Sequence, residues 1–141
     1  VQVGAVLVKD RRIISCGYNG VPSGQEECVD YFKRIYNSHN IDLTFWAWCE
    51  REDFKDLHRE FSINNELHGE QNAIGYAARN GINTSGSTMY LTISPCKQCA
   101  KLIIAAGIKR VIYQEIYNRA EDDGIPLLQQ NNVECVLYVN S

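Results

Sequence analysis

The chain lacks an excess of basic residues. Its 14 lysines and arginines are outnumbered by 17 aspartates and glutamates, which gives a formal net charge of −3 at pH 7. Proteins that bind long nucleic acids usually carry a basic patch or stripe. The charge therefore argues against an enzyme that acts on a nucleic acid polymer and favours a small-molecule substrate.

Long apolar runs are also missing. A helix that crosses a bilayer needs about 20 apolar residues in succession, and no stretch of the sequence approaches that length. Val1-Gln2-Val3-Gly4 leads directly into an expected strand, so we expect neither a signal peptide nor a membrane partner. The six cysteines are scattered, which favours a reducing compartment. We expect a cytoplasmic protein, in the host cytoplasm if its source is viral.

Internal repeats and low-complexity segments are absent as well. With 141 residues, of which 45% are hydrophobic and 22% charged, the chain can bury one core but not two. We therefore expect a single domain over residues 1–141. Residues 25–65 are the least regular part and read as an insertion, with partial helices at about 28–37 and 50–60.

The hydrophobic pattern predicts an alternation of strands and helices. Strands are expected at 3–8, 12–18, 87–93, 109–113 and 133–139, and helices at 67–80, 95–107 and 122–131. The first two strands form a hairpin, and the later helices have the spacing of crossovers between parallel strands. The predicted fold is α/β, a three-layer α/β/α sandwich with a five-stranded mixed sheet and helices on both faces.

Four side chains suggest a metal-dependent hydrolytic site. Cys96 and Cys99 are three positions apart at the start of a predicted helix, so their sulfurs share one face. With the imidazole of His68 they supply three ligands, which leaves the fourth position of a tetrahedral Zn²⁺ for water. Glu70 lies two residues after His68 and is suited to carrying protons from that water rather than to binding the ion.

Each half of this pattern has a simpler explanation. A Cys-x-x-Cys pair alone can be a redox pair or half of a structural zinc site, and His-x-Glu on a helix is common. A thioredoxin-like redox pair follows the first strand, whereas this pair comes late in the chain. A structural zinc site needs a fourth protein ligand close by, and no further cysteine or histidine lies within twenty residues of the pair. The combination of His-x-Glu with Pro-Cys-x-x-Cys is the signature of zinc nucleobase deaminases.

The whole chain resembles the cytidine deaminase superfamily, and within it the deoxycytidylate (dCMP) deaminases of phage type. The segments that carry the resemblance are Val3-Gly4-Ala5-Val6, Gly17-Tyr18-Asn19-Gly20, His68-Gly69-Glu70-Gln71-Asn72-Ala73-Ile74, Ser94-Pro95-Cys96-Lys97-Gln98-Cys99-Ala100-Lys101 and Ala106-Gly107-Ile108-Lys109. The resemblance implies hydrolysis of dCMP to dUMP and ammonia, with dCTP as a second substrate to test, in a pathway that supplies dUMP for dTTP synthesis. The family usually has a helix before the first strand, which covers one sheet face, whereas this sequence starts at the strand.

The resemblance also implies substrate contacts. Asn19 would bind the sugar 3′-hydroxyl, although an asparagine before glycine also suits a turn. Tyr117 would pack on the base and deoxyribose, or would be an ordinary aromatic residue at the rim. Further contacts are expected from Ser94, Pro95, Gly69, Asn65 and Glu66.

Some phage-type relatives carry a structural zinc in the region that corresponds to the insertion. Cys28, Cys49 and His58, with His39 nearby, are the residues that would bind a second zinc here. Loops of this composition show no obvious core of their own, so a metal would help to order them. The alternative is two buried free cysteines and two surface histidines.

Members of the family are typically homohexamers that dCTP activates and dTTP inhibits. By resemblance, the residues of such an effector site would be Gly20, Ser23, Gly24, Tyr76 and Arg79, with Mg²⁺ accompanying a triphosphate effector. Arg79 has the simpler role of capping the end of its helix.

Two other functions are compatible with the motifs. A polynucleotide cytosine deaminase would flip a base into the same pocket, which the acidic charge disfavours. A non-catalytic zinc-binding module would have no need of Glu70.

Overall fold

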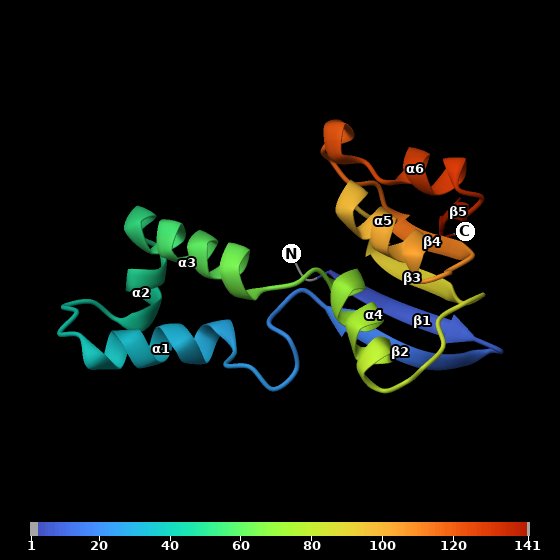
Figure 1. The fold of residues 1–141 in the computed structure, drawn as a ribbon. Helices are drawn as coiled ribbons and strands as arrows, with labels where there is room; N and C mark the ends of the chain where they lie inside the picture. Colours follow the sequence, from blue (N-terminus) through green and yellow to red (C-terminus); the bar gives the residue numbers. More distant parts are fainter. Residues whose placement is uncertain (1–2, 141) are drawn as a thin grey trace. The chain divides into compact units, whose positions relative to one another are not determined.

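Two segments far apart in the sequence form the first of two structural units. The computed structural model describes residues 3–140, so Val1 and Gln2, expected to lead into the first strand, lie outside the described residues. One unit comprises Val1–Asn19 and His68–Ser141, and the other comprises Gly20–Leu67 (Figure 1). Within residues 3–140, none of the helices is long and apolar enough to span a bilayer.

The first unit is built on a mixed sheet. Its strands are β1 (Gly4–Lys9), β2 (Arg12–Tyr18), β3 (Thr88–Ile93), β4 (Arg110–Glu115) and β5 (Glu134–Leu137). Among the described residues they form one five-stranded sheet in the order β2-β1-β3-β4-β5. Strand β1 is antiparallel to β2 and β3, whereas β3, β4 and β5 are parallel. The predicted α/β fold with a five-stranded mixed sheet is confirmed.

The hairpin between β1 and β2 is closed by two residues. Asp10 and Arg11 both have positive φ, at 52° and 60°. A two-residue loop with positive φ at both positions is the type I′ turn, whose twist matches that of the flanking strands. The turn places the start of β1 beside the end of β2, where the functional residues gather.

Helices connect the parallel strands of this unit. They are α4 (Gly69–Arg79), α5 (Lys97–Ala105) and α6 (Ile125–Gln130), with a short 3₁₀ helix, η1 (Ala120–Asp122), before α6. Right-handed crossovers that move in one direction along a sheet put their helices on the same face. Accordingly, α4 packs on α5 and α5 on α6.

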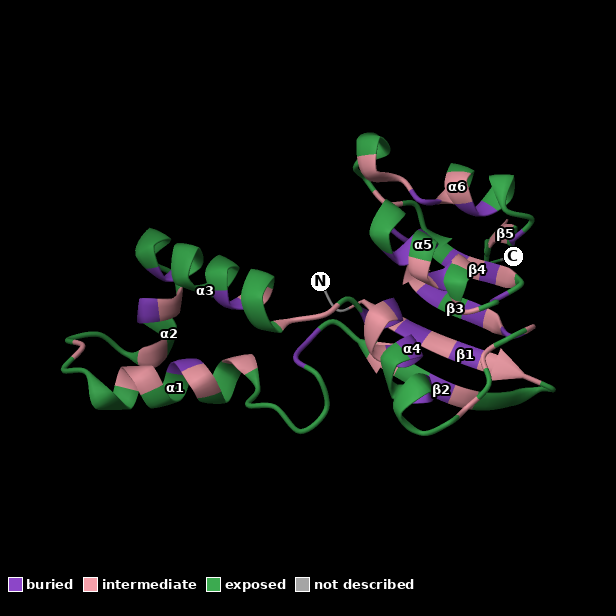
Figure 2. Ribbon diagram, in the orientation of Figure 1, coloured by how far each residue is buried: buried purple, intermediate pink, exposed green. Residues whose placement is uncertain are grey.

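The shared helical layer covers one face of the sheet. The core between the sheet and the helices consists mainly of Ala5, Leu7, Met89, Leu91, Val111, Ala73, Ile103 and Leu128. Alternate residues such as Val6, Tyr90 and Ile112 lie on the other face and are only partly buried or exposed. Figure 2 shows buried and less buried positions alternating along β1. The sequence predicted helices on both faces, whereas the helices described in this unit share one face, because all three crossovers run in the same direction.

The second unit is helical. It contains α1 (Cys28–Ser38), α2 (Phe45–Cys49) and α3 (Glu52–Asn65). The two helices predicted in the insertion correspond to α1 and α3, while α2 was not predicted. At five residues, α2 is too short to show a helical hydrophobic period. Thr44 begins it by accepting a hydrogen bond from the Ala47 amide.

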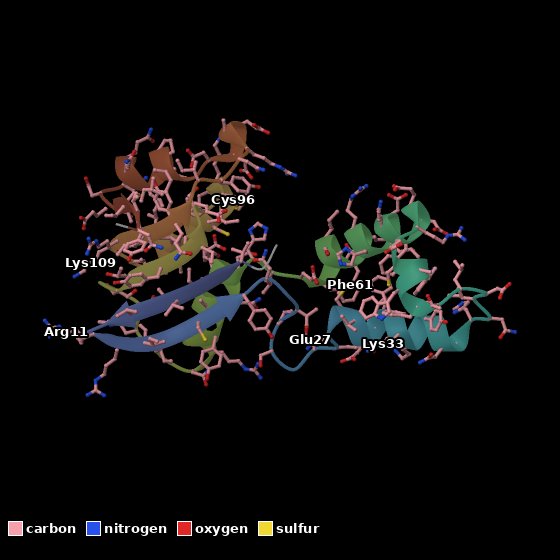
Figure 3. The ribbon with its side chains drawn as sticks, turned by 180° about the vertical axis from the view of Figure 1, so that it is seen from behind. Arg11, Glu27, Lys33, Phe61, Cys96 and Lys109 are labelled. Atoms are coloured by element: carbon pink, nitrogen blue, oxygen red, sulfur yellow. The ribbon has the colours of Figure 1, made fainter. Side chains whose placement is uncertain are left out.

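An aromatic cluster forms the core of the second unit. Figure 3 shows Phe61 among the side chains of this unit. The Phe54 ring packs against Phe32 and Trp48, with centroids 4.8 and 4.9 Å away, and Phe61 packs on Tyr31 at 4.7 Å. Such aromatic pairs stabilise a fold by more than the burial of their surface area alone would give. The expectation that this region lacks a core of its own is therefore wrong.

The ends of the second unit are paired with each other. The Gly20 amide donates to the Leu67 carbonyl at 3.1 Å, and the Leu67 amide donates to the Gly20 carbonyl at 2.8 Å. These two bonds form an isolated antiparallel bridge. The chain therefore leaves the first unit after Asn19 and returns to it at His68. The residues next to these two points, Gly20 and Leu67, are hydrogen-bonded to each other.

The start of α4 lies unusually close to β2. A Cβ atom at Gly17 would lie 2.4 Å from the Gly69 carbonyl oxygen and 2.5 Å from the Ala73 nitrogen. Backbone atoms of the strand and helix therefore pack directly against each other. Ser15 adds a hydrogen bond from its buried hydroxyl to the Ala73 carbonyl at 2.6 Å. Together these contacts fix the position of the helix that carries Glu70.

We predict that Gly17→Ala lowers the free energy of unfolding by about 3 kcal/mol or more, at the upper end of the usual cost of overpacking. The cost arises because the added methyl group meets backbone atoms that cannot rotate away. Gly75→Ala in α4 is the matched control, since its Cβ meets no described atom within 4 Å. We expect it to be neutral or to stabilise the helix by about 0.5–1 kcal/mol. Urea unfolding measures both, and equal stability of the two variants would contradict the prediction.

Candidate active site

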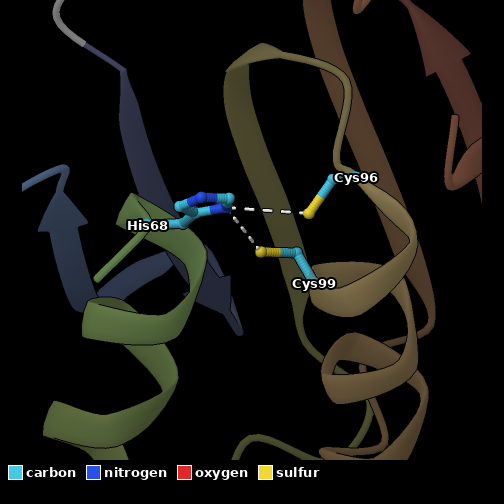
Figure 4. A group of neighbouring side chains, drawn as sticks. All are labelled: His68, Cys96 and Cys99. Carbon is cyan, nitrogen blue, oxygen red and sulfur yellow. Dashed lines mark hydrogen bonds between the residues drawn. The ribbon is translucent and has the colours of Figure 1, made fainter. Parts of the chain in front are cut away.

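Three potential ligand atoms meet at one edge of the sheet. His68 immediately precedes α4, Cys96 immediately precedes α5, and Cys99 lies in the first turn of α5. His68 Nδ1 lies 3.3 Å from Cys99 Sγ and 3.6 Å from Cys96 Sγ (Figure 4). The three ligand atoms are all within 4.8 Å of one another. Of the groups of three or more His, Cys, Asp or Glu residues in the described range, this one alone could hold a metal.

The spacing of these atoms fits tetrahedral zinc. With Zn–S of about 2.3 Å and Zn–N of about 2.0–2.1 Å, a tetrahedral ion separates nitrogen from sulfur by about 3.5–3.6 Å. The two distances from His68 Nδ1 are close to this value. Three protein ligands also leave one position for water, as in catalytic rather than structural zinc sites.

The ionisation of the two thiols also favours a bound cation. Hydrogen bonds from Cys99 and His68 lower the pKa of Cys96 to about 3. The hydrogen bond to Cys96, together with burial, raises the pKa of Cys99 above its ordinary value. The two neighbouring thiols thus disfavour carrying two negative charges at once. A divalent cation would allow both to be thiolates, which is the form that binds zinc.

Glu70 lies beside these ligands in a buried position. Its residue is only 4% exposed, and burial raises the pKa of its carboxyl group, against the lowering effect of its own backbone amide and of His68. A hydrogen bond also links the carboxyl group to the Cys99 thiol. The structure thus places an acid–base group of raised pKa next to the three ligand atoms, where it can exchange protons with a water at the fourth position.

A pocket opens onto this group. Its lining residues come from several segments that meet at this edge of the sheet: Val3, Asn19, His68, Glu70, Ile93, Ser94, Cys96 and Tyr117. Its volume of about 180 Å³ is below the roughly 300–1,000 Å³ of pockets for drug-sized ligands. The enclosed part therefore suits one small ring rather than a large ligand.

Val3 and Ile93 line the pocket but were missed by the sequence analysis. The pairing of Ala5 with Leu91 in antiparallel strands puts residues two positions further, Val3 and Ile93, at the same edge. The available signal was the rule that ligands bind at the carboxyl ends of parallel strands. It would have indicated Ile93, the last residue of β3, and through the antiparallel hairpin also Val3.

Asn19, Ser94 and Tyr117, all predicted to contact substrate, line this pocket. Ser94 is 2% exposed, and its hydroxyl accepts a hydrogen bond from the Tyr117 amide at 2.7 Å. The Ser94 amide donates to the Glu115 carbonyl at 2.8 Å. The end of β3 therefore holds the segment after β4, and with it the ring of Tyr117, at the pocket.

The other predicted substrate residues have different surroundings. Pro95 is fully buried, and its carbonyl accepts from the Gly124 amide at 2.9 Å. Gly69, which stands between His68 and Glu70 in the sequence, is buried. Asn65 and Glu66 end α3 in the second unit, where the Asn65 amide group donates to the Phe61 carbonyl. A substrate contact by these residues stays a prediction.

The four residues expected to bind a second zinc do not come together as a metal-binding group within residues 3–140. The His58 ring packs near Phe54 and Phe32, with centroids 6.2 and 6.1 Å apart. His39 Nδ1 lies 2.9 Å from the Ile35 carbonyl oxygen. Cys28 and Cys49 pack against the aromatic cluster. The aromatic cluster thus gives the second unit a core of its own, and a second zinc at these four residues stays a prediction.

The residues expected at an effector site are divided between the two units. Gly20, Ser23 and Gly24 belong to the second unit. Tyr76 is 49% exposed on α4, and Arg79 lies in the last turn of the same helix. An effector role for these residues stays a prediction.

Comparisons with known proteins agree with this site. Residues 1–115 match the family model described as the cytidine and deoxycytidylate deaminase zinc-binding region. The deoxycytidylate deaminase of Enterobacteria phage T4 is 38% identical over 148 residues, which cover 94% of this chain and 77% of that protein. The human deoxycytidylate deaminase is 34% identical over 113 residues, which cover 79% of this chain and 52% of that protein.

A solved structure is similar over nearly the whole chain. The dCMP deaminase from the cyanophage S-TIM5, in complex with dCMP and dUMP, has a TM-score of 0.66 and is 33% identical. The match covers 96% of this chain and 80% of that chain.

We predict that the purified protein binds zinc at His68, Cys96 and Cys99 and that Cys99→Ser loses this ion. The loss is expected because one of only two thiolate ligands is removed. Cys16→Ser is the control, since Cys16 is exposed and is not one of the three ligands. It should retain the metal. Elemental analysis measures zinc content: Cys99→Ser should hold one zinc per chain fewer than the wild type, and two zinc ions in the wild type would support the second site predicted at Cys28, Cys49, His58 and His39.

Bound zinc should also stabilise the fold. Free zinc at 1,000 times its Kd would add about 4 kcal/mol to the free energy of unfolding. A chelator should therefore lower the melting temperature of the wild type and of Cys16→Ser, but not that of Cys99→Ser. Equal shifts in all three proteins would contradict the ligand assignment.

Proposed function

Because this chain belongs to the family of cytidine and deoxycytidylate deaminases, we propose that its pocket hydrolyses dCMP to dUMP and ammonia. The observation that carries the proposal is the buried carboxyl group of Glu70 next to two sulfurs and an imidazole nitrogen in one pocket. That combination is suited to activating water against the carbon that bears an amino group.

The proposed roles follow from the position of each residue. His68, Cys96 and Cys99 would hold zinc, which would lower the pKa of a water towards roughly 7. Glu70 accepts a proton from the attacking water and delivers it to N3 of the cytosine ring. It then takes the proton of the hydroxyl group that has added to the ring carbon and passes it to the 4-amino group, so that ammonia leaves and a carbonyl forms. Without that proton the amino group would have to leave as an unstable anion.

The remaining pocket residues bind and orient the nucleotide. Val3 and Ile93 form apolar walls that exclude bulk water from the base. Tyr117, held by the Ser94 hydroxyl, offers an aromatic surface for the base and deoxyribose. Asn19 offers its amide NH₂ to the sugar 3′-hydroxyl. These contacts hold the 4-amino carbon near Glu70, which is the proximity effect that most enzymes require.

Several finer properties stay predictions, drawn from the resemblance or, for the location, from the scattered cysteines and the absence of a signal-peptide pattern. They are a homohexameric assembly, activation by dCTP and inhibition by dTTP, Mg²⁺ bound with a triphosphate effector, a second zinc, turnover of dCTP, a role in supplying dTTP synthesis, and a cytoplasmic location. The net charge of −3 supports a free nucleotide as substrate rather than a nucleic acid polymer.

We predict that Glu70→Gln abolishes turnover while zinc stays bound. General acid–base steps contribute about 10²–10⁴-fold each, and Glu70 serves more than one, so kcat should fall by about 10⁴-fold or more. Ammonia release from dCMP and zinc content are measured on the same sample. Appreciable activity of the zinc-loaded variant would contradict the role of Glu70, because glutamine is similar in shape but cannot accept the proton.

We also predict that dCMP is deaminated with a higher kcat/KM than dC, CMP or single-stranded DNA. The reason is that the similar phage T4 protein is a deoxycytidylate deaminase and the similar cyanophage structure holds dCMP and dUMP, while the net charge of −3 disfavours a nucleic acid polymer. Ammonia release from dC, dCMP, dCTP, CMP and a cytosine-containing oligonucleotide, each with and without dTTP, measures the preference. Preferred turnover of the oligonucleotide would favour the polynucleotide deaminase instead.

A further inference from the structure

Asn19 makes a hydrogen bond that its predicted contact with the sugar does not explain. Its Oδ1 accepts from the Gly69 backbone amide at 2.8 Å. Gly69 is the first residue of α4 and stands between His68 and Glu70. The first backbone N–H groups of a helix have no partner within the helix, so this donor needs an acceptor from elsewhere. Asn19, directly after β2, provides it.

The neighbouring N–H group is satisfied differently. The His68 amide donates to Gln71 Oε1 at 2.8 Å, a bond within the first turn of α4 itself. That bond can move with the helix. The bond from Gly69 to Asn19, in contrast, ties the helix start to another segment of the chain.

Packing limits movement of the Gly69 peptide on the other side. Gly69 is buried, and a Cβ built on it would lie 3.2 Å from the Val3 carbonyl oxygen and 3.3 Å from the Gly17 carbonyl oxygen. The peptide therefore has little room to approach β1 and β2, while the Asn19 bond prevents it from moving away. The position of the peptide is restrained in both directions.

We propose that Asn19 is a positioning residue for Glu70, acting through the Gly69 amide; this rests on the proposed function. The acceptor oxygen holds the peptide that precedes Glu70, and so sets where the buried carboxyl group lies relative to His68, Cys96 and Cys99. Proton transfer needs heavy atoms within about 2.6–3.2 Å, and a displacement of about 1 Å can cost about 10²-fold in rate.

The side-chain amide of Asn19 has two separable functions under this proposal. Oδ1 accepts from the Gly69 amide, and the hydrogen-bond donor that the Asn19 side chain can offer a ligand in the pocket is its NH₂ group. Loss of the acceptor should lower kcat, because Glu70 is no longer held. Loss of the donor should raise KM, because a contact with the nucleotide is lost. Two substitutions distinguish these effects.

Asn19→Ala removes both groups, whereas Asn19→Asp keeps an acceptor oxygen and removes the donor. We expect kcat of Asn19→Ala to fall by about 10–100-fold with zinc content unchanged. In Asn19→Asp, kcat should stay within about threefold of the wild type, since a carboxylate accepts from a backbone amide at least as well, while KM rises. An added carboxylate raises the pKa of nearby acids, so kcat is compared at the plateau of each pH profile.

Asn72→Ala is the matched control for general loosening of α4. The Asn72 side chain donates to the Tyr18 carbonyl at 2.8 Å, which is another hydrogen bond between α4 and β2. This variant should lose stability without a selective loss of kcat. A fall in kcat equal to that of Asn19→Ala would show that any weakening of this contact slows the reaction, and would overturn the specific role of Asn19.

Hydrogen exchange of the Gly69 amide, followed by NMR without substrate, reports on the bond itself. The amide should be protected in the wild type, in Asn19→Asp and in Asn72→Ala, and should exchange at least tenfold faster in Asn19→Ala. Unchanged exchange in Asn19→Ala would overturn the proposal. So would wild-type kcat in Asn19→Ala with only KM raised, or equal losses of kcat in the alanine and aspartate variants.

The same design separates this proposal from the proposed function. A wild-type protein that releases no ammonia from dCMP would overturn the function. The exchange measurement needs no substrate, and would then decide by itself whether Asn19 holds the start of α4.

Discussion

The close approach of one imidazole nitrogen to two cysteine sulfurs is the constraint on which the rest of the site depends. His68 belongs to the crossover from β2 to β3, and Cys96 and Cys99 belong to the crossover from β3 to β4. Two successive crossovers can share an ion only if their helices begin side by side at the same edge of the sheet. The direct packing of β2 on α4 at Gly17 supports one half of that arrangement. The zinc, when bound, would join the two halves.

The parts of the site that the sequence predicted are those set by local spacing. Cys96 and Cys99 share a helical face because they are three residues apart, and Glu70 follows His68 at the start of the next helix along the sheet. Both relations hold for any fold that puts a helix there. The contributions of Val3, Ile93 and the Asn19–Gly69 bond depend instead on strand register and on the distance between a strand and a helix. Neither is encoded in a short stretch of sequence.

The differences from the predicted fold have a similar origin. The hydrophobic period of α4, α5 and α6 shows that each helix buries one of its sides. Which face of the sheet each helix covers depends on the order of the strands, and the period does not reveal that order. In the second unit, the abundance of aromatic residues was evident in the sequence, whereas the pairing of Phe54 with Phe32 and Trp48 arises from three helices meeting. Composition alone therefore did not show that the rings of this segment form a core of their own.

The paired ends of the second unit have a consequence for how such proteins can diverge. Gly20 and Leu67 bond to each other through their backbones, so the 48-residue span that they delimit enters and leaves the first unit at a single point. A segment with adjoining ends can be lengthened, shortened or exchanged for another during evolution, because the chain on either side need not shift. Asn19 and His68, which flank the junction, would keep their places on the sheet while the helical excursion between them acquired new sequence.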